Sequence, residues 1–297
     1  FRSNNGKWSE SYDGDGGFHQ VFIGLGYKVF NNLSVGANFS YLYGDITHQS
    51  MTTIGATDTR SIKLDKFSIS DYKLDFGLQY TYKLNKKNTI NIGAVYTLGR
   101  TLHGDAYKYH QTGAESNGSI YVQSQTGDTI PNPFKMPHTF GIGLTYVYDN
   151  RLTIGVDYTL QKWNTADLAW SKFNKESVEM NSRTKIAFGA EFVPSYISHN
   201  YLKRIRYRMG AYYSSPYNKV SYTSPDTGTT SFQDGAREYG VSIGFGLPMF
   251  QSKSMLNISG QYIKVSPKFK GLMEENYLRI NIGLTFNERW FMKWKVD

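Results

Sequence analysis

Bulky apolar residues alternate with small or polar residues along much of the chain, most regularly between Met136 and Asn164. An Asp149-Asn150 pair interrupts the alternation once, where a tight turn fits. Side chains two residues apart share one face of a β-strand, so this stretch predicts a hairpin with one apolar and one polar face. The apolar positions are Phe140, Ile142, Leu144, Tyr146 and Tyr148, followed by Leu152, Ile154, Val156, Tyr158 and Leu160.

The same two-residue period predicts about eleven strands in the whole chain. No stretch shows a convincing helical period of 3.6 residues. We therefore expect one all-β domain over residues 1–297. The expected strands cover roughly residues 17–29, 33–47, 61–84, 89–98, the two strands of the 136–164 hairpin, 183–193, 205–213, 239–247, 256–262 and 278–286.

The strands have the character of a transmembrane antiparallel β-barrel, the fold class that we predict. Many run for about ten residues, end in aromatic residues, and carry glycine or charge on the polar face, as expected when one face meets lipid and the other an aqueous lumen. Mean hydropathy is only −0.48, which such a barrel permits because half of each strand faces water. No apolar run reaches the roughly 20 residues of a spanning helix, which excludes a helical membrane protein.

Short and long connections alternate between the expected strands. The short ones are 31–32, 85–88, 149–150, 194–203 and 248–254, and the long polar ones are 48–60, 113–135, 165–182, 215–236 and 264–276. Residues 1–15 are also polar and rich in turn formers. Outer-membrane barrels keep short turns at the periplasm and long loops outside, so the first and last strands should both descend. Bacterial barrels have even strand numbers, so we expect an odd number of further strands upstream of Phe1 in the full protein.

The charge and the composition narrow the class of partner. The formal charge is +9 and cysteine is absent, so the chain has neither disulfides nor thiolate metal ligands. The basic residues are spread out, apart from the cluster Lys203–Arg208. This distribution favours attraction to membrane lipid headgroups and lipopolysaccharide over binding of nucleic acid. Phe1 is not a start methionine and no signal peptide is visible at the start of the sequence, which therefore looks like a mature or truncated piece of a bacterial outer-membrane protein.

The motifs that would carry catalysis or bind a metal lack the context that they need. Gly240-Val-Ser242-Ile-Gly244 matches a nucleophile pattern, but that chemistry needs a strand–elbow–helix turn, and here the serine falls within a predicted strand. Asp13 and Asp15 suggest a calcium loop without the bidentate glutamate at its twelfth position. The histidines have no metal-binding spacing. We expect no enzyme activity, no metal and no cofactor.

Charged residues on the polar faces of the strands are the candidate lumen-lining and ligand-binding positions. A charge facing lipid near the midplane costs about 2–4 kcal/mol, so these residues should face the lumen. Two roles remain open for them: ion pairs that brace the wall, or attraction of a carboxylate headgroup whose tail contacts apolar lumen residues. The charged candidates are Lys73, Asp75, Asp157, Lys185, Glu191, Arg206, Arg208 and Arg279. Tyr212 also falls on the inward register and is a candidate for contact with the tail.

Several stretches resemble the FadL/TodX family of outer-membrane transporters for long-chain fatty acids and other hydrophobic compounds. The 136–164 hairpin has that family's strand start at Pro137, Phe140 and Gly143 and closes on Trp163-Asn164. The strands within 206–217 and 239–248 are similar to two later strands of the family, and the tail at 287–297 is similar to that of members from Bacteroidota. The resemblance covers roughly the C-terminal 170 residues.

This resemblance implies a barrel of about 14 strands, with three of them upstream of residue 1. It also implies passive transport of a hydrophobic ligand, which would bind near the surface and leave by a lateral or periplasmic route. The family's N-terminal plug and its Asn-Pro-Ala type motif have no counterpart in the sequence, so no plug residue can be assigned.

A second hypothesis is a structural or adaptor barrel within a larger outer-membrane secretion or assembly complex. Some FadL-like barrels of Bacteroidota serve such machineries, and protein partners would then contact the loops at 113–135 and 215–236. A transporter should have a lumen pocket of roughly 300–1,000 Å³, whereas an adaptor should have a filled lumen and long ordered loops. A third hypothesis, an outer-membrane hydrolase, is disfavoured by the failed motif context.

Overall fold

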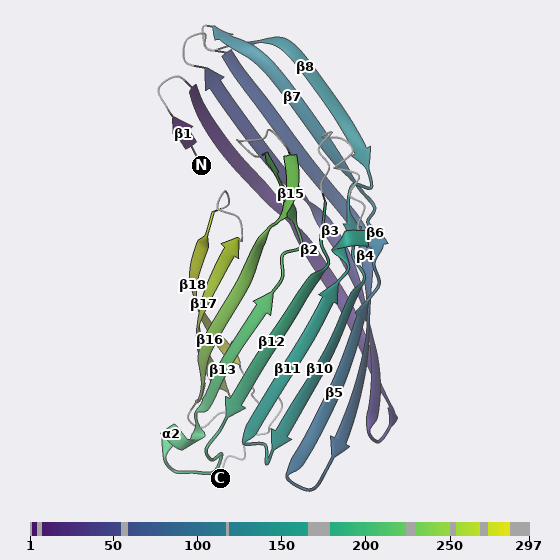
Figure 1. The fold of residues 1–297 in the computed structure, drawn as a ribbon, viewed down its shortest axis with the longest axis vertical. Helices are drawn as coiled ribbons and strands as arrows, with labels where there is room; N and C mark the ends of the chain where they lie inside the picture. The colour runs from purple at the N-terminus through teal and green to yellow at the C-terminus, as the bar shows by residue number, and fades with distance from the viewer. Residues whose placement is uncertain are drawn as a thin grey trace, which may run out of the picture.

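The computed structural model of the chain describes residues 2–4, 8–54, 59–116, 119–165, 179–223, 230–249, 254–267 and 273–285. One antiparallel sheet of 14 strands contains most of these residues (Figure 1). Among the described residues, no helix is both long and apolar enough to cross a membrane. The predicted all-β fold class is confirmed.

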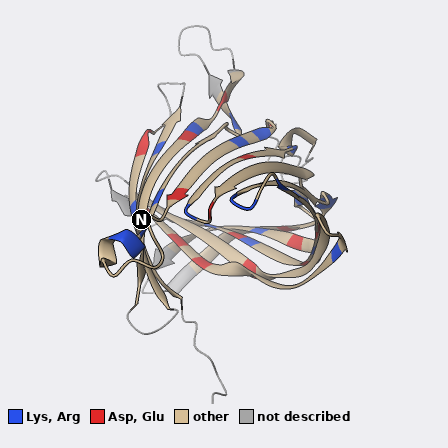
Figure 2. Cartoon of the chain, turned by 90° about the horizontal axis from the view of Figure 1, so that it is seen from below, with Lys and Arg blue, Asp and Glu red and all other residues tan. Residues whose placement is uncertain are grey.

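Eleven consecutive strands form the wall, and each is hydrogen-bonded antiparallel to the next. Viewed end-on, the wall curves round a central axis (Figure 2). The eleven strands predicted from the alternation are all present. They are β2 (Trp8–Phe30), β3 (Leu33–Ile54), β4 (Thr59–Lys83), β5 (Asn88–Thr97), β10 (Thr139–Tyr148), β11 (Leu152–Gln161), β12 (Arg183–Phe192), β13 (Arg206–Ser214), β16 (Ala236–Pro248), β17 (Met255–Pro267) and β18 (Glu275–Thr285).

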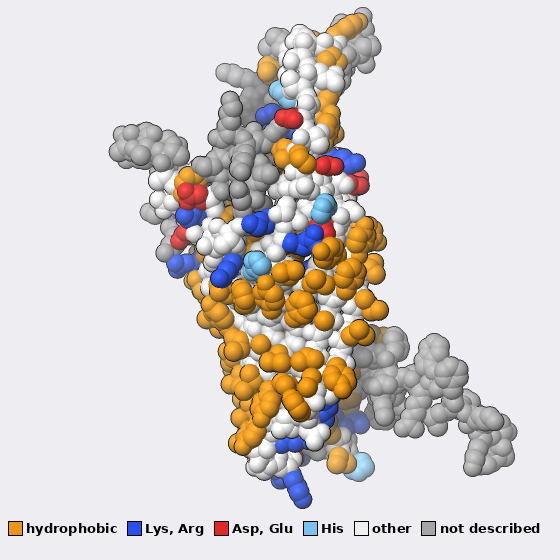
Figure 3. Space-filling view, turned by 90° about the vertical axis from the view of Figure 1, so that its right-hand side faces the viewer, with side chains coloured by type: hydrophobic (Ala, Val, Ile, Leu, Met, Phe, Trp, Pro, Cys, Tyr) orange, Lys and Arg blue, Asp and Glu red, His pale blue; other side chains and the backbone are white. Residues whose placement is uncertain are grey.

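The apolar faces of these strands line up on the outside of the wall. Register places Leu144 beside Val156, and Val156 beside Phe188, so that apolar residues of neighbouring strands form continuous rows. Figure 3 shows the result as an apolar band with charged side chains above and below it. Aromatic residues border the band, as in outer-membrane barrels. At the lower border Tyr148 shares a row with Phe192 and Tyr207 through Leu152.

A sheet extension rises beyond the upper end of the wall. β2, β3 and β4 have 23, 22 and 25 residues, about twice the 9–11 residues that cross a bilayer. Their upper halves are joined by β7 (Gly104–Ser116), which pairs with β4, and by β8 (Ser119–Pro131), which pairs with β7. A short β1 (Arg2–Asn4) pairs with the start of β2. We call these upper strands the extension (Figure 1).

The extension corrects three expectations from the sequence. Residues 1–15 and 48–60 were expected to be turn-rich or looped, but their described parts are largely strand, and the expected loop 113–135 is mostly β7 and β8. In the extension polar residues occupy both faces. One row across its inner face reads Glu10, Thr52, Ser61 and Thr112. Without an apolar face the strands leave no two-residue hydrophobic period, and backbone pairing alone defines them.

The other connections are compact. The expected loop 215–236 contains the hairpin β14 (Lys219–Thr223) and β15 (Thr230–Asp234), a further correction, and 194–203 leads into α2 (Tyr201–Arg204). Two-residue β6 (Arg100–Thr101) and β9 (Lys135–Met136) pair beside the upper rim, and a 3₁₀ turn η1 (Trp163–Thr165) follows β11. Most of the expected loop 165–182, and the tail at 287–297, lie outside the described residues.

The two edge strands of the wall, β2 and β18, are not paired with each other. Among the described residues, β18 pairs only with β17, and the part of β2 that follows Ser11 in the sequence pairs only with β3. Ten antiparallel steps separate β2 from β18, so these two strands run in the same direction. Backbone groups must be hydrogen-bonded within the hydrocarbon layer. Antiparallel closure would take an odd number of strands between the two edges, and the expected number of three stays a prediction.

The outward and inward faces can be distinguished by charge insertion. We expect Leu144→Arg, in the middle of the apolar band, to lower the free energy of unfolding by about 2–4 kcal/mol, because the guanidinium would face lipid. The matched variant Thr145→Arg on the adjacent inward position should change it by less than about 1 kcal/mol, since its charge would reach water. Urea unfolding of the full-length protein in phospholipid vesicles measures both. Equal losses in the two variants would contradict this assignment of faces.

Candidate functional site in the barrel lumen

The inward face of the wall carries two polar networks separated by a belt of small residues. All three lie on β11, β12, β13, β16 and β17, where every second residue points inward. In the belt, Gly155, Gly189, Gly210 and Ser242 occupy one row across four strands. Four residues along β13, or about 13 Å, separate Tyr212 in the upper network from Arg208 in the lower.

The lower network is centred on Glu191 of β12. Its two carboxylate oxygens accept hydrogen bonds from Arg206 Nη1 at 2.9 Å and Arg208 Nε at 2.6 Å. Arg208 Nη1 also donates to Asn257 Oδ1 at 2.7 Å. Gly246 on the next strand gives Arg206 room to lie across the wall, because a Cβ there would meet Arg206 Cβ at 3.1 Å. This arrangement is a wall-bracing ion network in which both arginines are hydrogen-bonded to one carboxylate, with a net charge of +1.

The upper network is centred on Tyr212. Its hydroxyl donates to Glu238 Oε1 at 2.5 Å, and Lys185 Nζ lies 4.4 Å from the centre of its ring. Arg183 donates through Nε to Ser214 Oγ at 2.7 Å and has Nη2 3.9 Å from Glu238. Arg183 therefore approaches the one carboxylate of this network, whereas Lys185 contacts only an aromatic face. The network keeps positive charge available on the lumen side.

Glycine makes the upper network fit. The Tyr212 ring lies flat over Gly240 of β16, where any added Cβ would overlap ring carbons. Asp157 likewise lies over Gly143 of β10. Inward side chains thus lie along the wall instead of projecting across the lumen.

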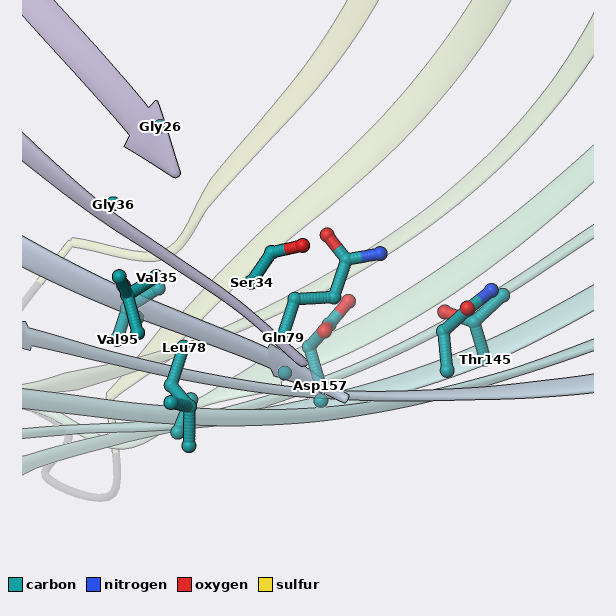
Figure 4. Close-up of a pocket in the computed structure, with 14 residues that line it drawn as sticks. Gly26, Ser34, Val35, Gly36, Leu78, Gln79, Val95, Thr145 and Asp157 are labelled. Atoms are coloured by element: carbon teal, nitrogen blue, oxygen red, sulfur yellow. The ribbon is translucent and has the colours of Figure 1, made fainter. Parts of the chain in front are cut away.

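A cavity of about 580 Å³ opens against the opposite part of this inward wall. Its lining is largely small: Gly36, Gly77 and Gly93 contribute no side chain. Figure 4 shows Ser34, Gln79, Thr145 and Asp157 on one side of the sheet, toward the cavity. The volume falls within the range typical of small-molecule sites.

The structure brings most of the sequence-predicted site residues into pairs. Lys185 meets Tyr212, Arg206 and Arg208 share Glu191, and Lys73 Nζ bonds to Asp75 Oδ2 at 2.7 Å. Asp75 also accepts from Thr97 at 2.6 Å. Asp157 on β11 and Arg279 on β18 make no ion pair with a described residue, although the charge of Arg279 acts on Tyr212.

Sequence reasoning missed three partners, Arg183, Glu238 and Asn257. Each has the same strand parity as a predicted inward residue, so the two-residue rule could have found them. Their omission reflects their place near strand ends. Ser242, the serine of the nucleophile-like pattern, lies within β16 with its hydroxyl 3.5 Å from Gly210 O. It has no elbow turn, as expected.

The extension offers a second, polar surface on its inner face. A cavity of about 560 Å³ there is lined by Lys63, Lys108, His110, Thr126 and Asp128, among others. His110 Nε2 lies 3.0 Å from Ser61 Oγ. At the far edge, a hydrogen bond from Tyr12 to Glu10, together with that carboxylate's charge, raises the pKa of the Tyr12 phenol. Among the described residues no three His, Asp or Glu side chains gather as metal ligands.

Comparison with known proteins gives one family match and several matches of fold. The sequence profile of the BamG family matches residues 2–297. No curated protein matches. A FadL homologue of Pseudomonas aeruginosa is 11% identical with a TM-score of 0.56, over 89% of this chain and 68% of that one. The toluene transporter TbuX of Ralstonia pickettii is 11% identical with a TM-score of 0.53, over 96% of this chain and 80% of that one.

Two further matches differ in TM-score and in the share of the matched protein that is covered. A TodX mutant, a monoaromatic hydrocarbon channel, is 12% identical with a TM-score of 0.54, over 93% of this chain and 77% of that one. The chain spans only 37% of the matching chain of the RagAB peptide importer, with a TM-score of 0.41. The resemblance to FadL/TodX proteins is therefore confirmed as one of fold, and that fold is the outer-membrane β-barrel.

The fit of Tyr212 over Gly240 can be tested with one methyl group. We expect Gly240→Ala to lower the free energy of unfolding by about 1–3 kcal/mol, because the new Cβ must displace the Tyr212 ring from Glu238. Gly189→Ala is the matched control, since a Cβ at that inward glycine meets nothing within 4 Å. Urea unfolding in vesicles measures both variants. If Gly189→Ala costs as much as Gly240→Ala, the ring contact is not the cause.

Proposed function

The chain belongs to the BamG family, and on that premise we propose that it is an outer-membrane barrel that admits hydrophobic small molecules with an anionic group, such as long-chain fatty acids. The observation that carries the proposal is the unfilled inward wall. Glycine and serine form the belt across β11, β12, β13 and β16, and a cavity of about 580 Å³ lies against the opposite part of the wall. A purely structural barrel would gain stability by filling this space with side chains.

Positive charge on the upper part of the inward wall supports an anionic headgroup. Lys185 contacts the Tyr212 ring and no carboxylate, and Arg279 makes no ion pair with a described residue. A ligand carboxylate would accept charge-assisted hydrogen bonds from such groups, which are stronger than neutral ones. The lower network differs, because each of its arginines is already hydrogen-bonded to Glu191.

Apolar inward residues supply contacts for a ligand tail. By register Phe22 shares the inward row of Lys73 and is 69% exposed. Val95 shares the inward row of Gly77 and is 58% exposed. Exposed apolar side chains on a lumen face are the groups that an acyl chain would cover. The fold shared with a toluene transporter and a hydrocarbon channel is consistent with such a ligand.

Removal of the free cations should affect acids but not esters. In the full-length protein we expect Lys185→Gln with Arg279→Gln to reduce uptake of a long-chain fatty acid about tenfold, because a charge-assisted hydrogen bond contributes about 1.5–3 kcal/mol. Uptake of the methyl ester should stay unchanged. The test is radiolabelled uptake by cells that carry the variant as their only copy.

The matched control for this pair is Lys86→Gln with Lys87→Gln, which removes the same charge from the short turn after β4. It should leave uptake of both compounds unchanged. The role of the charges is refuted if the lumen variant reduces uptake of the acid and of the ester equally, or reduces uptake of neither. Reduced uptake of both compounds by the control variant would indicate a general loss of the protein from the membrane.

A second candidate function, an adaptor barrel in a multiprotein complex, is favoured by the extension. Its strands continue for roughly twelve residues, or about 40 Å, past the length needed to span. No other described layer of secondary structure packs on the faces of β7 and β8, and their polar faces present hydrogen-bonding groups. Ordering such a surface costs conformational entropy, and contacts with a protein that docks on it would offset this cost.

This second candidate predicts a complex that depends on β7 and β8. The native protein should form a stoichiometric complex in detergent extracts. Replacement of residues 105–130 by a short Gly-Ser connection should abolish this complex, while fatty-acid uptake is kept. A variant shortened in the β14–β15 hairpin identifies whether that hairpin contributes. Size-exclusion chromatography with mass determination reads both. A native protein that runs as a single barrel at all concentrations would contradict the adaptor function.

A further inference from the structure

A cluster of cationic side chains lies on the outer surface of the barrel, along the upper edge of the apolar band. Figure 3 shows Lys, Arg and His side chains gathered there, directly above a row of hydrophobic ones. They come from three connections that meet at this rim: β6 after β5, β9 before β10, and the end of β11. We call Arg100, Lys135 and Lys162 the basic collar.

Each member of the collar is held against the aromatic edge of the band or beside it. The Arg100 guanidinium lies 3.8 Å from the centre of the Tyr72 ring, and Lys162 Nζ lies 5.5 Å from the centre of the Phe140 ring. Lys135 pairs with Thr101, the residue after Arg100, in the β6–β9 ladder and donates to Thr165 O at 2.9 Å. Phe140 and Tyr72 have outward parity, so the two cations above them also face out.

The collar has more positive charge than its surroundings neutralise. Among the described residues its single carboxylate contact is Asp71, whose Oδ1 is 3.4 Å from Arg100 and which also accepts from the backbone N–H groups of Tyr72 and His103. Arg100 Nη1 is buried and has no hydrogen-bond partner among the described residues. On the other side of the rim, by contrast, Lys264 pairs with Glu274 at 2.6 Å and Lys219 with Glu179 at 2.7 Å.

The height of the collar identifies what it meets. Aromatic residues at the border of the band lie at the level of lipid headgroups. Long basic side chains there cover apolar rings with their stems and hold the charge in the headgroup layer. The upper end has the long connections, so this layer belongs to the outer leaflet. An anionic group at that level, attached to acyl chains, satisfies both the cations and the rings below them.

We propose that the basic collar binds the phosphate groups of a lipid A-type glycolipid, whose acyl chains lie against Tyr72, Tyr96 and Phe140. The spread of cations over three connections suits a headgroup with more than one phosphate. His138, bonded through Nδ1 to Tyr96 OH at 2.8 Å, lies at the same level. The site is on the lipid side of the wall, and it is independent of any ligand in the lumen.

The test uses the full-length protein in detergent, with purified lipid A, its dephosphorylated form and phosphatidylglycerol as probes, and native mass spectrometry as the readout. Wild-type protein should retain lipid A in preference to both other lipids. Lys135→Gln with Lys162→Gln should weaken lipid A binding by about fivefold for each lysine removed.

The matched control is Arg237→Gln with Lys264→Gln, which removes two charges from the upper ends of β16 and β17 and should keep wild-type lipid A binding. Neither lysine of the collar lies in the interior of a wall strand, so the collar variant is expected to fold. Heat-modified electrophoresis verifies that each variant is folded. Unchanged lipid A binding by the folded collar variant would overturn the proposal. Equal retention of dephosphorylated lipid A or of phosphatidylglycerol by the wild type would overturn the assignment to lipid A phosphate.

Discussion

The requirement that every backbone N–H and C=O in the hydrocarbon layer be hydrogen-bonded is the constraint on which this structure depends. The antiparallel ladder from β2 to β18 meets it within the wall, strand by strand. The ladder fixes the register, and the register fixes which side chains form rows. Rows such as Leu144, Val156 and Phe188 outside, or Gly155, Gly189 and Gly210 inside, follow directly from that pairing.

Because the ladder supplies the fold, the inward side chains need not pack as a core. Wide lumen walls of small residues are therefore tolerated, and polar groups can be placed with few steric neighbours. The wall uses this freedom in two ways. Around Glu191 it hydrogen-bonds two arginines to one carboxylate, whereas around Tyr212 it leaves Lys185 on an aromatic face. Glycine opposite a large side chain, as at Gly240, lets that side chain lie along the wall.

The outer surface and the extension show what happens where the ladder leaves the lipid. At the rim, rings of the apolar band carry cations such as Arg100 on their faces. Above the rim, β2, β3 and β4 keep pairing in water, where no apolar face is required. A sheet in water with both faces polar gains little from burial, so its persistence rests on backbone hydrogen bonds and on whatever covers it.

The amino-acid sequence by itself determined the class of fold, the eleven wall strands and the face of each strand. These follow from a local rule: neighbouring residues of a strand point to opposite sides, and lipid selects apolar ones. The same rule placed Lys73, Asp157 and Arg279 on the inward face. It failed at 113–135, where polar strands β7 and β8 carry no hydrophobic period. Their strand state comes from pairing with β4, which is a non-local contact.

Only the tertiary structure decided which inward charges meet. Arg206, Arg208 and Glu191 are 15 and 17 residues apart and come together through the register of β12 and β13. The collar likewise unites Arg100 with Lys135 and Lys162 from separate connections. Alternation along one strand carries no information about the stagger between strands. That stagger is set by turn geometry and barrel curvature, and it alone converts a list of polar residues into sites.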